Sequence, residues 1–158
     1  MSLFLSVDQS TSATKAILFD SSGQLLDQVA LEHRQFYPQP GWVEHDAEEI
    51  YQNLLAVVGL LLKRRPEAQS AVGLSITNQR ETFVLFDAAT GRPLHNAVVW
   101  QCVRGEPFCR TLRAAGHEPA LHAVTGLKID SYFPAAKVRA LLDQRPDLAE
   151  RLADGTAL

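Results

Sequence analysis

The stretch LFLSVDQSTSATKAILF, residues 3–19, contains the pattern that starts the fold. Two apolar runs of strand length, residues 3–7 and 16–19, flank a polar segment that is too short for a helix. We therefore expect a β-hairpin whose tip carries one carboxylate, four hydroxyl groups and one ammonium group. Hydroxyls and backbone N–H groups suit a phosphate and a carboxylate suits Mg²⁺, but the same residue types also build ordinary turns. This stretch alone favours an ordinary turn.

The residues after the hairpin predict a third strand and then a helix. Residues 25–34 have an imperfect strand pattern, so three consecutive strands would form an antiparallel meander. Asp46 is a typical helix N-cap, and Glu49 stands at the matching position of a capping box. Apolar residues recur at helical spacing over residues 50–62, and Pro66 limits any continuation.

The second half of the chain alternates predicted strands and helices. Strands are expected at residues 71–76, 82–86 and 97–100, and helices at residues 105–115 and 137–142. A strand meander followed by alternating strands and helices predicts an α/β domain with a mixed sheet.

Composition excludes several classes of protein. A chain of 158 residues with 46% apolar content can bury one core, which favours a single domain. The net charge of −3, with scattered basic residues, argues against a nucleic-acid or anionic membrane partner. No signal peptide or membrane-spanning run is evident. Cys102 and Cys109 match no disulfide or metal pattern, so we expect reduced thiols in a cytoplasmic protein.

A second polar group lies between two predicted strands, at residues 77–81. Arg80 offers a planar fork of donors and Glu81 offers acceptors, which together suit a small molecule with several hydroxyl groups. Adjacent strand residues point to opposite faces, so both side chains reach one ligand only if the backbone bends there. A surface ion pair in a polar loop is the simpler interpretation of the spacing alone.

Five segments, taken in order, resemble the motifs of a known family. They are DQSTS (8–12), PQPGWVEHD (38–46), ITNQRET (76–82), VVWQC (98–102) and TGLKIDSYF (125–133). With them the chain resembles, from Phe4 to about Leu142, the N-terminal region of the FGGY carbohydrate kinases, in particular the glycerol kinase branch. Xylulose kinases of the family carry a Met-His pair where this chain has Arg80-Glu81.

The resemblance implies a fold and a nucleotide site. The fold would be the ribonuclease-H-like ATPase domain shared with actin and hexokinase. Asp8 would help to hold Mg²⁺, and Thr11, Ser12 and Lys15 would lie against the phosphates of ATP. The family usually has Gly where this chain has Ser10, and Arg where it has Lys15.

The resemblance also implies a polyol pocket. Arg80, Glu81 and Tyr132 would bind hydroxyl groups, and Trp100 would supply an apolar wall. Alternatively, Trp100 is a core residue and Tyr132 a surface anchor. Near Tyr132 the chain also departs from the family, with Pro134-Ala135-Ala136 in place of Ser-Gly-Thr.

We expect residues 1–158 to form an incomplete N-terminal FGGY kinase domain of a longer protein. The family's catalytic base is an Asp in a second, nucleotide-binding domain, so no residue here is expected to be the base, and residues 1–158 alone are expected to be inactive. The expected reaction transfers the ATP γ-phosphoryl group to a primary hydroxyl of glycerol, with ATP and Mg²⁺ as cofactors. The alternatives are a kinase for another polyol or sugar and a non-catalytic polyol-binding or regulatory module. A homo-oligomer is possible.

Overall fold

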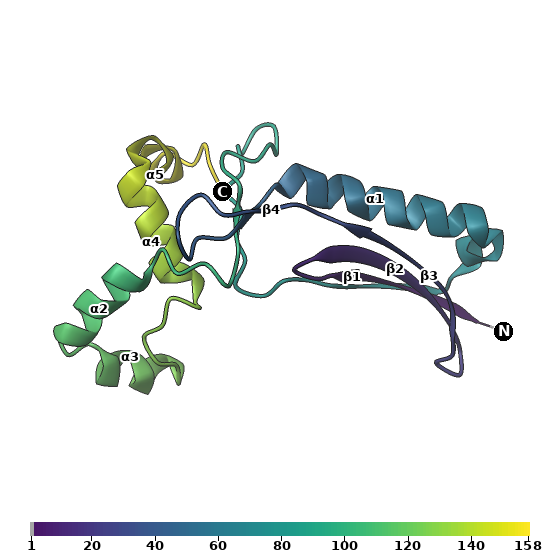
Figure 1. Ribbon diagram of the computed structural model, residues 1–158, viewed down its shortest axis with the longest axis horizontal. Coiled ribbons are helices and arrows are strands. Elements are labelled where there is room, and N and C mark those ends of the chain that lie inside the picture. The colour runs from purple at the N-terminus through teal and green to yellow at the C-terminus, as the bar shows by residue number, and fades with distance from the viewer. Residues whose placement is uncertain (1) are drawn as a thin grey trace. The chain divides into compact units, whose positions relative to one another are not determined.

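The computed structural model describes residues 2–158 and divides the chain into two compact units (Figure 1). The first unit runs to Gln35 and resumes from His45 to Arg80, and the second contains Phe36–Glu44 and Glu81–Leu158. Length alone favours one core, but each unit has its own cluster of buried apolar side chains. Each unit is therefore described separately.

The first unit is built on a mixed sheet, as the sequence predicts. Its elements are β1 (Leu3–Gln9), β2 (Ala13–Asp20), β3 (Leu25–Glu32), α1 (Ala47–Arg64), a 3₁₀ turn η1 (Pro66–Ser70) and β6 (Gly73–Thr77). Strands β1, β2 and β3 are antiparallel neighbours, and β6 pairs parallel to β1, which gives the order β3-β2-β1-β6. Parallel pairing requires a crossover, and the chain returns to β6 through helix α1.

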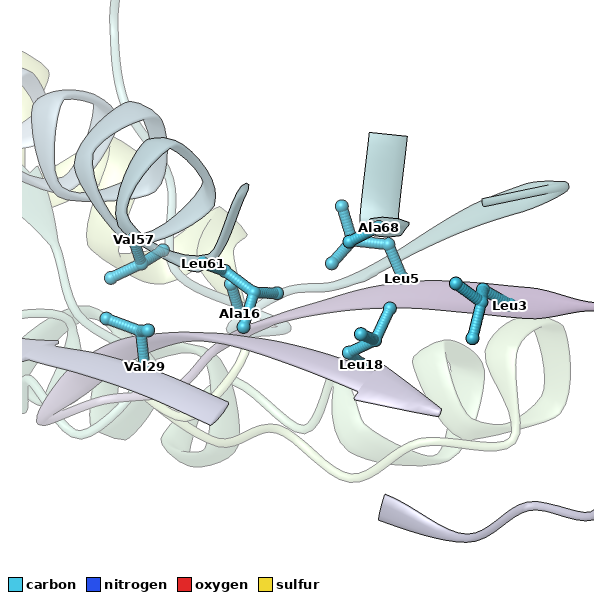
Figure 2. Close-up of a cluster of buried hydrophobic side chains, with 8 residues drawn as sticks. All are labelled: Leu3, Leu5, Ala16, Leu18, Val29, Val57, Leu61 and Ala68. Atoms are coloured by element: carbon cyan, nitrogen blue, oxygen red, sulfur yellow. The ribbon is translucent and has the colours of Figure 1, made fainter. Parts of the chain in front are cut away.

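Helix α1 covers one face of this sheet (Figure 1). Side chains alternate along β1 and β2, so Leu5 and Leu18 are buried on the face that α1 covers. Figure 2 shows Val57 and Leu61 of α1 pointing toward the sheet, and both are fully buried. By the same alternation, Ser6 and Asp8 of β1 lie on the opposite face.

Helix α1 begins at the predicted N-cap. The carboxylate of Asp46 accepts hydrogen bonds from the backbone N–H groups of Glu48 (2.9 Å) and Glu49 (3.3 Å). The carboxylate of Glu49 is paired with Arg34, whose Nε lies 3.0 Å away. The cap satisfies two donors at the helix start, a contribution of about 1 kcal/mol to stability.

The second unit is mainly helical. Its helices are α2 (Glu106–Ala114), α3 (Glu118–Thr125), α4 (Pro134–Gln144) and α5 (Pro146–Ala153). A second sheet has the order β4-β5-β7, from the short strands β4 (Gln35–Phe36), β5 (Glu44–His45) and β7 (Ala97–Val98). No helix in residues 2–158 is long and apolar enough to span a membrane.

Helices α2 and α4 pack closely where α2 begins. A Cβ atom at Gly105 would lie 2.7 Å from the backbone carbon of Ala136, so this contact requires a glycine. The close approach places the first turn of α4, including the buried Lys137, against the segment that precedes α2.

The strand predicted at residues 82–86 is wrong. The segment makes only isolated bridges, from Phe83 to Val98 and from Phe86 to Pro93. Glu81 takes a left-handed backbone conformation (φ 63°) just before it, and β7 offers a partner of only two residues. Within residues 2–158 the segment therefore has no extended partner long enough for a regular ladder.

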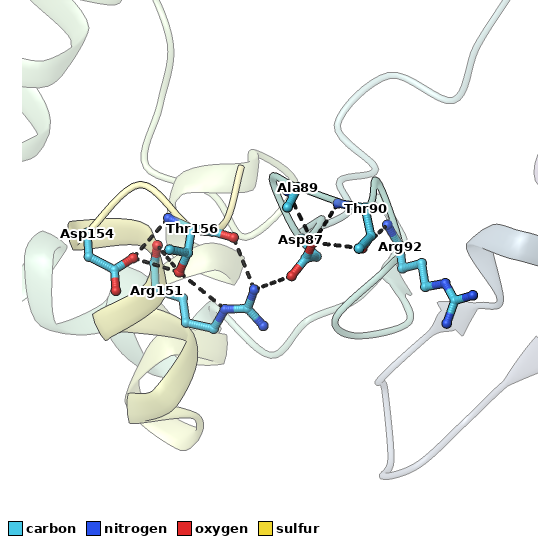
Figure 3. Close-up of polar contacts among 7 residues, drawn as sticks. All are labelled: Asp87, Ala89, Thr90, Arg92, Arg151, Asp154 and Thr156. Atoms are coloured by element: carbon cyan, nitrogen blue, oxygen red, sulfur yellow. Dashed lines mark hydrogen bonds and ion pairs between the residues drawn. The ribbon is translucent and has the colours of Figure 1, made fainter.

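Residues 156–158 pair with an earlier loop of the same unit. Phe86 and Leu158 exchange two backbone hydrogen bonds, of 2.8 and 2.9 Å. Figure 3 shows the side-chain contacts: Arg151 donates from Nη2 to Asp87 (2.5 Å) and to the Thr156 carbonyl (3.0 Å). The Thr90 hydroxyl and Arg151 hold the pKa of Asp87 well below its usual range.

Candidate functional site

Asp8 lies at the carboxyl-terminal end of β1, between two polar neighbours on the adjacent strands. The strand register places it opposite Lys15 of β2 and beside Thr77 of β6. Its carboxylate accepts a bond from Lys15 Nζ (3.2 Å) and one from the Thr77 hydroxyl (2.9 Å). The structure thus brings together Asp8 and Lys15, which the sequence singled out, and adds Thr77, which the sequence analysis missed. The only sequence signal for Thr77 is its place at the end of a predicted strand.

The Asp8–Lys15 pair is weak and exchangeable. The two side chains are 36% and 38% exposed, and such pairs contribute about 0–1 kcal/mol to stability. Lys15 can therefore exchange the carboxylate for a phosphate oxygen at little cost. Within residues 2–158 no three His, Cys, Asp or Glu side chains gather into a metal site. A single accessible carboxylate still fits Mg²⁺, which proteins commonly bind with one or two carboxylates and the phosphates of a substrate.

The turn between β1 and β2 is fixed from the body of the first unit. The carbonyl of Ser10 accepts a hydrogen bond from Gln79 Nε2 (3.0 Å). The carbonyl of Thr11 lies 2.8 Å from the ring Nε2 of His33, and the carbonyl of Ser12 accepts from the backbone N–H of His33 (3.2 Å). Such a turn is preorganised, so an anion that binds to it does not have to order it.

The serine at position 10 is accommodated without backbone strain. Among residues 2–158, Glu81 is the one non-glycine residue with a positive φ, so Ser10 does not use the conformation that favours glycine. Its hydroxyl donates to the carbonyl of Ala13 (2.8 Å), and its backbone N–H donates to the same oxygen (3.0 Å). The side chain therefore supports the turn.

A buried pair of histidines lies beneath this turn. The rings of His33 and His45 are in edge contact, with centroids 4.7 Å apart. Burial, helped by the nearby His33, lowers the pKa of His45 to about 4, so this ring is neutral at pH 7. The two histidines are 12 residues apart along the chain, a separation that gives no signal of their contact.

A second polar and aromatic group lies in the second unit. The rings of Trp100 and Tyr132 meet edge to face, with centroids 5.9 Å apart, and Tyr132 also contacts the ring of Phe133 at 5.3 Å. Tyr132 is 38% exposed, whereas Trp100 is half-buried and packs against the apolar core of the unit. Trp100 thus packs against the core and also contacts the ring of Tyr132.

Lys137 connects the backbones of three residues in this group. Its Nζ donates to the carbonyls of Glu81 (3.0 Å), Trp100 (3.3 Å) and Tyr132 (2.7 Å). The side chain is fully buried. Lys137 is not among the site residues predicted from the sequence, although a lysine four residues before Leu141, on the apolar side of a predicted helix, is an available signal.

The backbone takes an unusual conformation at Glu81, next to Arg80. Glu81 has its positive φ at this point, and the boundary between the two units passes between the two residues. Arg80, in the first unit, is exposed, and Glu81, in the second, is partly buried.

The PQPGWVEHD segment is held by a buried ion pair. The guanidinium of Arg104 pairs with Glu44 and lies 4.2 Å from the ring centroid of Trp42. The other oxygen of Glu44 accepts from the side-chain amide of Asn96 (3.1 Å). This network fixes the segment in the second unit, with the ring of Trp42 packed against the Arg104 guanidinium.

The fold, together with Asp8 and the turn at Ser10–Ser12, defines a class of protein. It is an α/β protein in which a carboxylate stands beside a hydroxyl-rich, preorganised turn at one end of a mixed sheet. That arrangement suits a phosphate with a bound metal ion.

Comparison with known proteins supplies the family. The model of the FGGY family of carbohydrate kinases, N-terminal domain, matches residues 3–156. This chain belongs to that family. It is 48% identical over 152 residues to a glycerol kinase of Symbiobacterium thermophilum, covering 96% of this chain and 30% of that protein. The chain thus spans about a third of the length of such relatives.

Two solved structures are similar to the chain in fold. The glycerol kinase of Plasmodium falciparum with ADP has a TM-score of 0.90 and 34% identity, covering 100% of this chain and 32% of that one. The xylulose kinase of Rhodospirillum rubrum has a TM-score of 0.85 and 25% identity, covering 92% and 30%.

Proposed function

We propose that the chain is the N-terminal part of an ATP-dependent kinase that phosphorylates a small polyol, with glycerol as the first candidate. The relatives named as glycerol kinases, 43–48% identical, favour glycerol over other substrates of the family. The geometric observation that carries the proposal is the carboxylate of Asp8 beside the fixed turn at Ser10–Ser12. The fold assignment proposed with it is the ribonuclease-H-like ATPase domain.

Asp8 and the residues of the turn that follows it would bind ATP and its metal ion. Thr11 and Ser12 would offer hydroxyl and backbone N–H donors to the phosphates, and Lys15 would turn from Asp8 to a phosphate oxygen. Asp8 is the residue that would hold Mg²⁺. When bound, this ion neutralises the charge that develops on the phosphate oxygens.

The second group and Arg80 would bind the polyol. Glu81 would accept from hydroxyl groups, while Arg80 and the Tyr132 hydroxyl would donate to them. The ring of Trp100 would cover the C–H face of the polyol. The Trp100–Tyr132 contact supports the second half of this assignment, because it puts an apolar wall beside a hydroxyl.

The reaction balances with these roles. The oxygen of a primary hydroxyl attacks the γ-phosphorus in line, the bond from that phosphorus to the β–γ bridging oxygen breaks, and ADP leaves. The hydroxyl proton goes to a base that we place in a second domain beyond the described residues. The residues here position the reactants and neutralise charge, so none of them is proposed as the base.

The test uses the full-length protein with a panel of polyols and sugars. ADP release and phosphorylated product are measured with ATP and Mg²⁺. We expect the highest kcat/KM with glycerol. A higher kcat/KM with another polyol or a sugar would move the substrate within the family. Binding of polyols without any turnover would replace the proposal by a non-catalytic binding module.

Two substitutions test the polyol pocket itself. Glu81→Gln removes the charge of an acceptor, and Arg80→Lys replaces a fork by one ammonium. Each should raise the KM for glycerol about ten- to a hundredfold, the loss of one charge-assisted hydrogen bond, with little change in the KM for ATP. An unchanged glycerol KM in both variants contradicts the pocket assignment.

A further inference from the structure

Lys137 is a charged side chain in a place that normally excludes charge. It lies in the first turn of α4, fully buried, on the same side of the helix as the buried Leu141. None of the ion pairs among residues 2–158 includes it. A buried ammonium is retained only where its hydrogen bonds are satisfied, so its partners identify what it does.

Those partners are three backbone carbonyls from three separate segments. An ammonium has three donors, and here they point to the carbonyls of Glu81, Trp100 and Tyr132 at 3.0, 3.3 and 2.7 Å. These residues are 56, 37 and 5 positions away along the chain. They are three of the four residues assigned above to the polyol pocket, and all lie in the second unit with Lys137.

Each of the three backbones has one further constraint. The backbone N–H of Trp100 donates to the Thr82 hydroxyl (3.1 Å), and that of Tyr132 donates to the Asp130 carboxylate (2.9 Å). The backbone of Glu81 has a left-handed conformation, which residues other than glycine rarely adopt and which persists only where surrounding contacts enforce it. The bond from Lys137 is such a contact.

We propose that Lys137 is a positioning residue of the polyol site, whose ammonium fixes the backbones of Glu81, Trp100 and Tyr132 so that their side chains meet one ligand. This inference rests on the proposed function. A lysine that served stability alone would need only enough acceptors to satisfy it. Here every acceptor is a carbonyl of a pocket residue, and each displacement of Nζ would shift all three pocket walls together.

The charge of Lys137 allows a second test of this role, because it changes with pH. Burial lowers the pKa of Lys137 to about 8, and the nearby charge of Arg104 acts in the same direction. Cys102, Glu81 and Asp130 act in the opposite direction and favour the charged form. Above that pH the group becomes an amine with two donors, so one of the three carbonyls loses its bond.

The experiment compares Lys137→Met with Lys63→Met in the full-length protein. Methionine keeps the length of the stem and removes the donors, and Lys63 is an exposed lysine in the last turn of α1, which makes a matched control. We expect Lys137→Met to raise the KM for glycerol about tenfold or more, because a displaced binding group is costly, with the KM for ATP changed less than about threefold. Lys63→Met should change neither constant.

The pH profile needs no variant and covers the case in which Lys137→Met does not fold. In the unmodified protein the KM for glycerol should rise between about pH 8 and 9.5 while the KM for ATP stays level. A folded Lys137→Met protein should lose that rise.

The outcomes separate the two ideas. No phosphorylation of any polyol or sugar by the unmodified protein overturns the proposed function, and the positioning role with it. An active protein whose Lys137→Met form changes both KM values equally, or whose glycerol KM is level from pH 7 to 9.5, overturns the positioning role alone.

Discussion

The carboxylate of Asp8 has two partners, and both are replaceable. Lys15 and Thr77 each contribute one hydrogen bond at a site that is about a third exposed to solvent. Weakly held partners of this kind suit a residue whose partner is to change when a nucleotide arrives. Burial at His45, by contrast, makes protonation itself the costly event. Single residues of the same small unit therefore respond to quite different conditions.

Asp8→Asn should reduce kcat of the full-length protein about a hundredfold or more, because an amide loses the charge that holds the metal ion. The KM for glycerol should change little, since Asp8 is not assigned to the polyol. Steady-state kinetics at saturating Mg²⁺ measure both constants. Asp27→Asn, on β3 of the same sheet and paired with Arg64, is the matched control. An Asp8→Asn protein that keeps most of its turnover would make Asp8 a turn residue only.

The lowered pKa of His45 predicts an acid-sensitive stability. Its ordinary pKa is 6.5 and the folded value is about 4, so the unfolded chain binds a proton first as the pH falls. The contribution of the neutral ring is complete above about pH 6.5 and is lost as the pH falls toward 4. Between pH 7.5 and 5 the free energy of unfolding should fall by about 2 kcal/mol from this group.

Urea unfolding at the two pH values measures this difference. His45→Gln should reduce the pH dependence, and His122→Gln, at an exposed position, should leave it as it is. Equal pH dependence in all three proteins would show that His45 does not titrate as its burial predicts.

At the scale of elements, the edge strand β6 exposes large apolar side chains. It ends the sheet order on one side, and its Leu74 and Ile76 are 61% and 58% exposed. The parallel register places them on the same face as Leu5 and Val7, which are buried. An edge strand with exposed apolar side chains readily pairs with another chain.

A protein consisting of residues 1–158 should therefore self-associate through β6 at raised concentration. Ile76→Lys should weaken the association several-fold, because a charge at an apolar edge opposes pairing. Ser75→Lys, which adds the same charge on the opposite face of the strand, is the control. Sedimentation velocity measures the effect, and association that both variants weaken equally would point to net charge instead of the edge.

At the scale of the whole molecule, the chain spans about a third of its curated relatives. We expect residues 1–158 alone to have no kinase activity, since we propose that the base and part of the ATP site belong to a second domain. ADP release with glycerol, ATP and Mg²⁺ is the measurement, and the full-length protein is the positive control. Glycerol phosphorylation by residues 1–158 that Asp8→Asn abolishes would contradict this expectation.

Local pattern was enough where the interactions that build an element are themselves local. The hairpin, the α1 stripe and the Asp46 cap depend on neighbours within a few residues, so the sequence predicts them. The strand predicted at residues 82–86 is wrong, because its neighbouring strand, β7, is short and the backbone of Glu81 is left-handed. Neither feature is visible in the local pattern. Helices α3 and α5 have eight residues each, too short for a clear apolar period.

The sequence by itself determined the class of this protein: a mixed α/β sheet, a hydroxyl-rich turn with one carboxylate, and the ordered motifs of the carbohydrate kinases. Only the tertiary structure decided which groups meet. Thr77 reaches Asp8 across a parallel pairing, His33 contacts the turn between β1 and β2 from the end of β3, and Lys137 binds carbonyls as far as 56 residues away. The reason is physical: such contacts depend on how separate elements pack, and spacing along the chain carries no record of that distance.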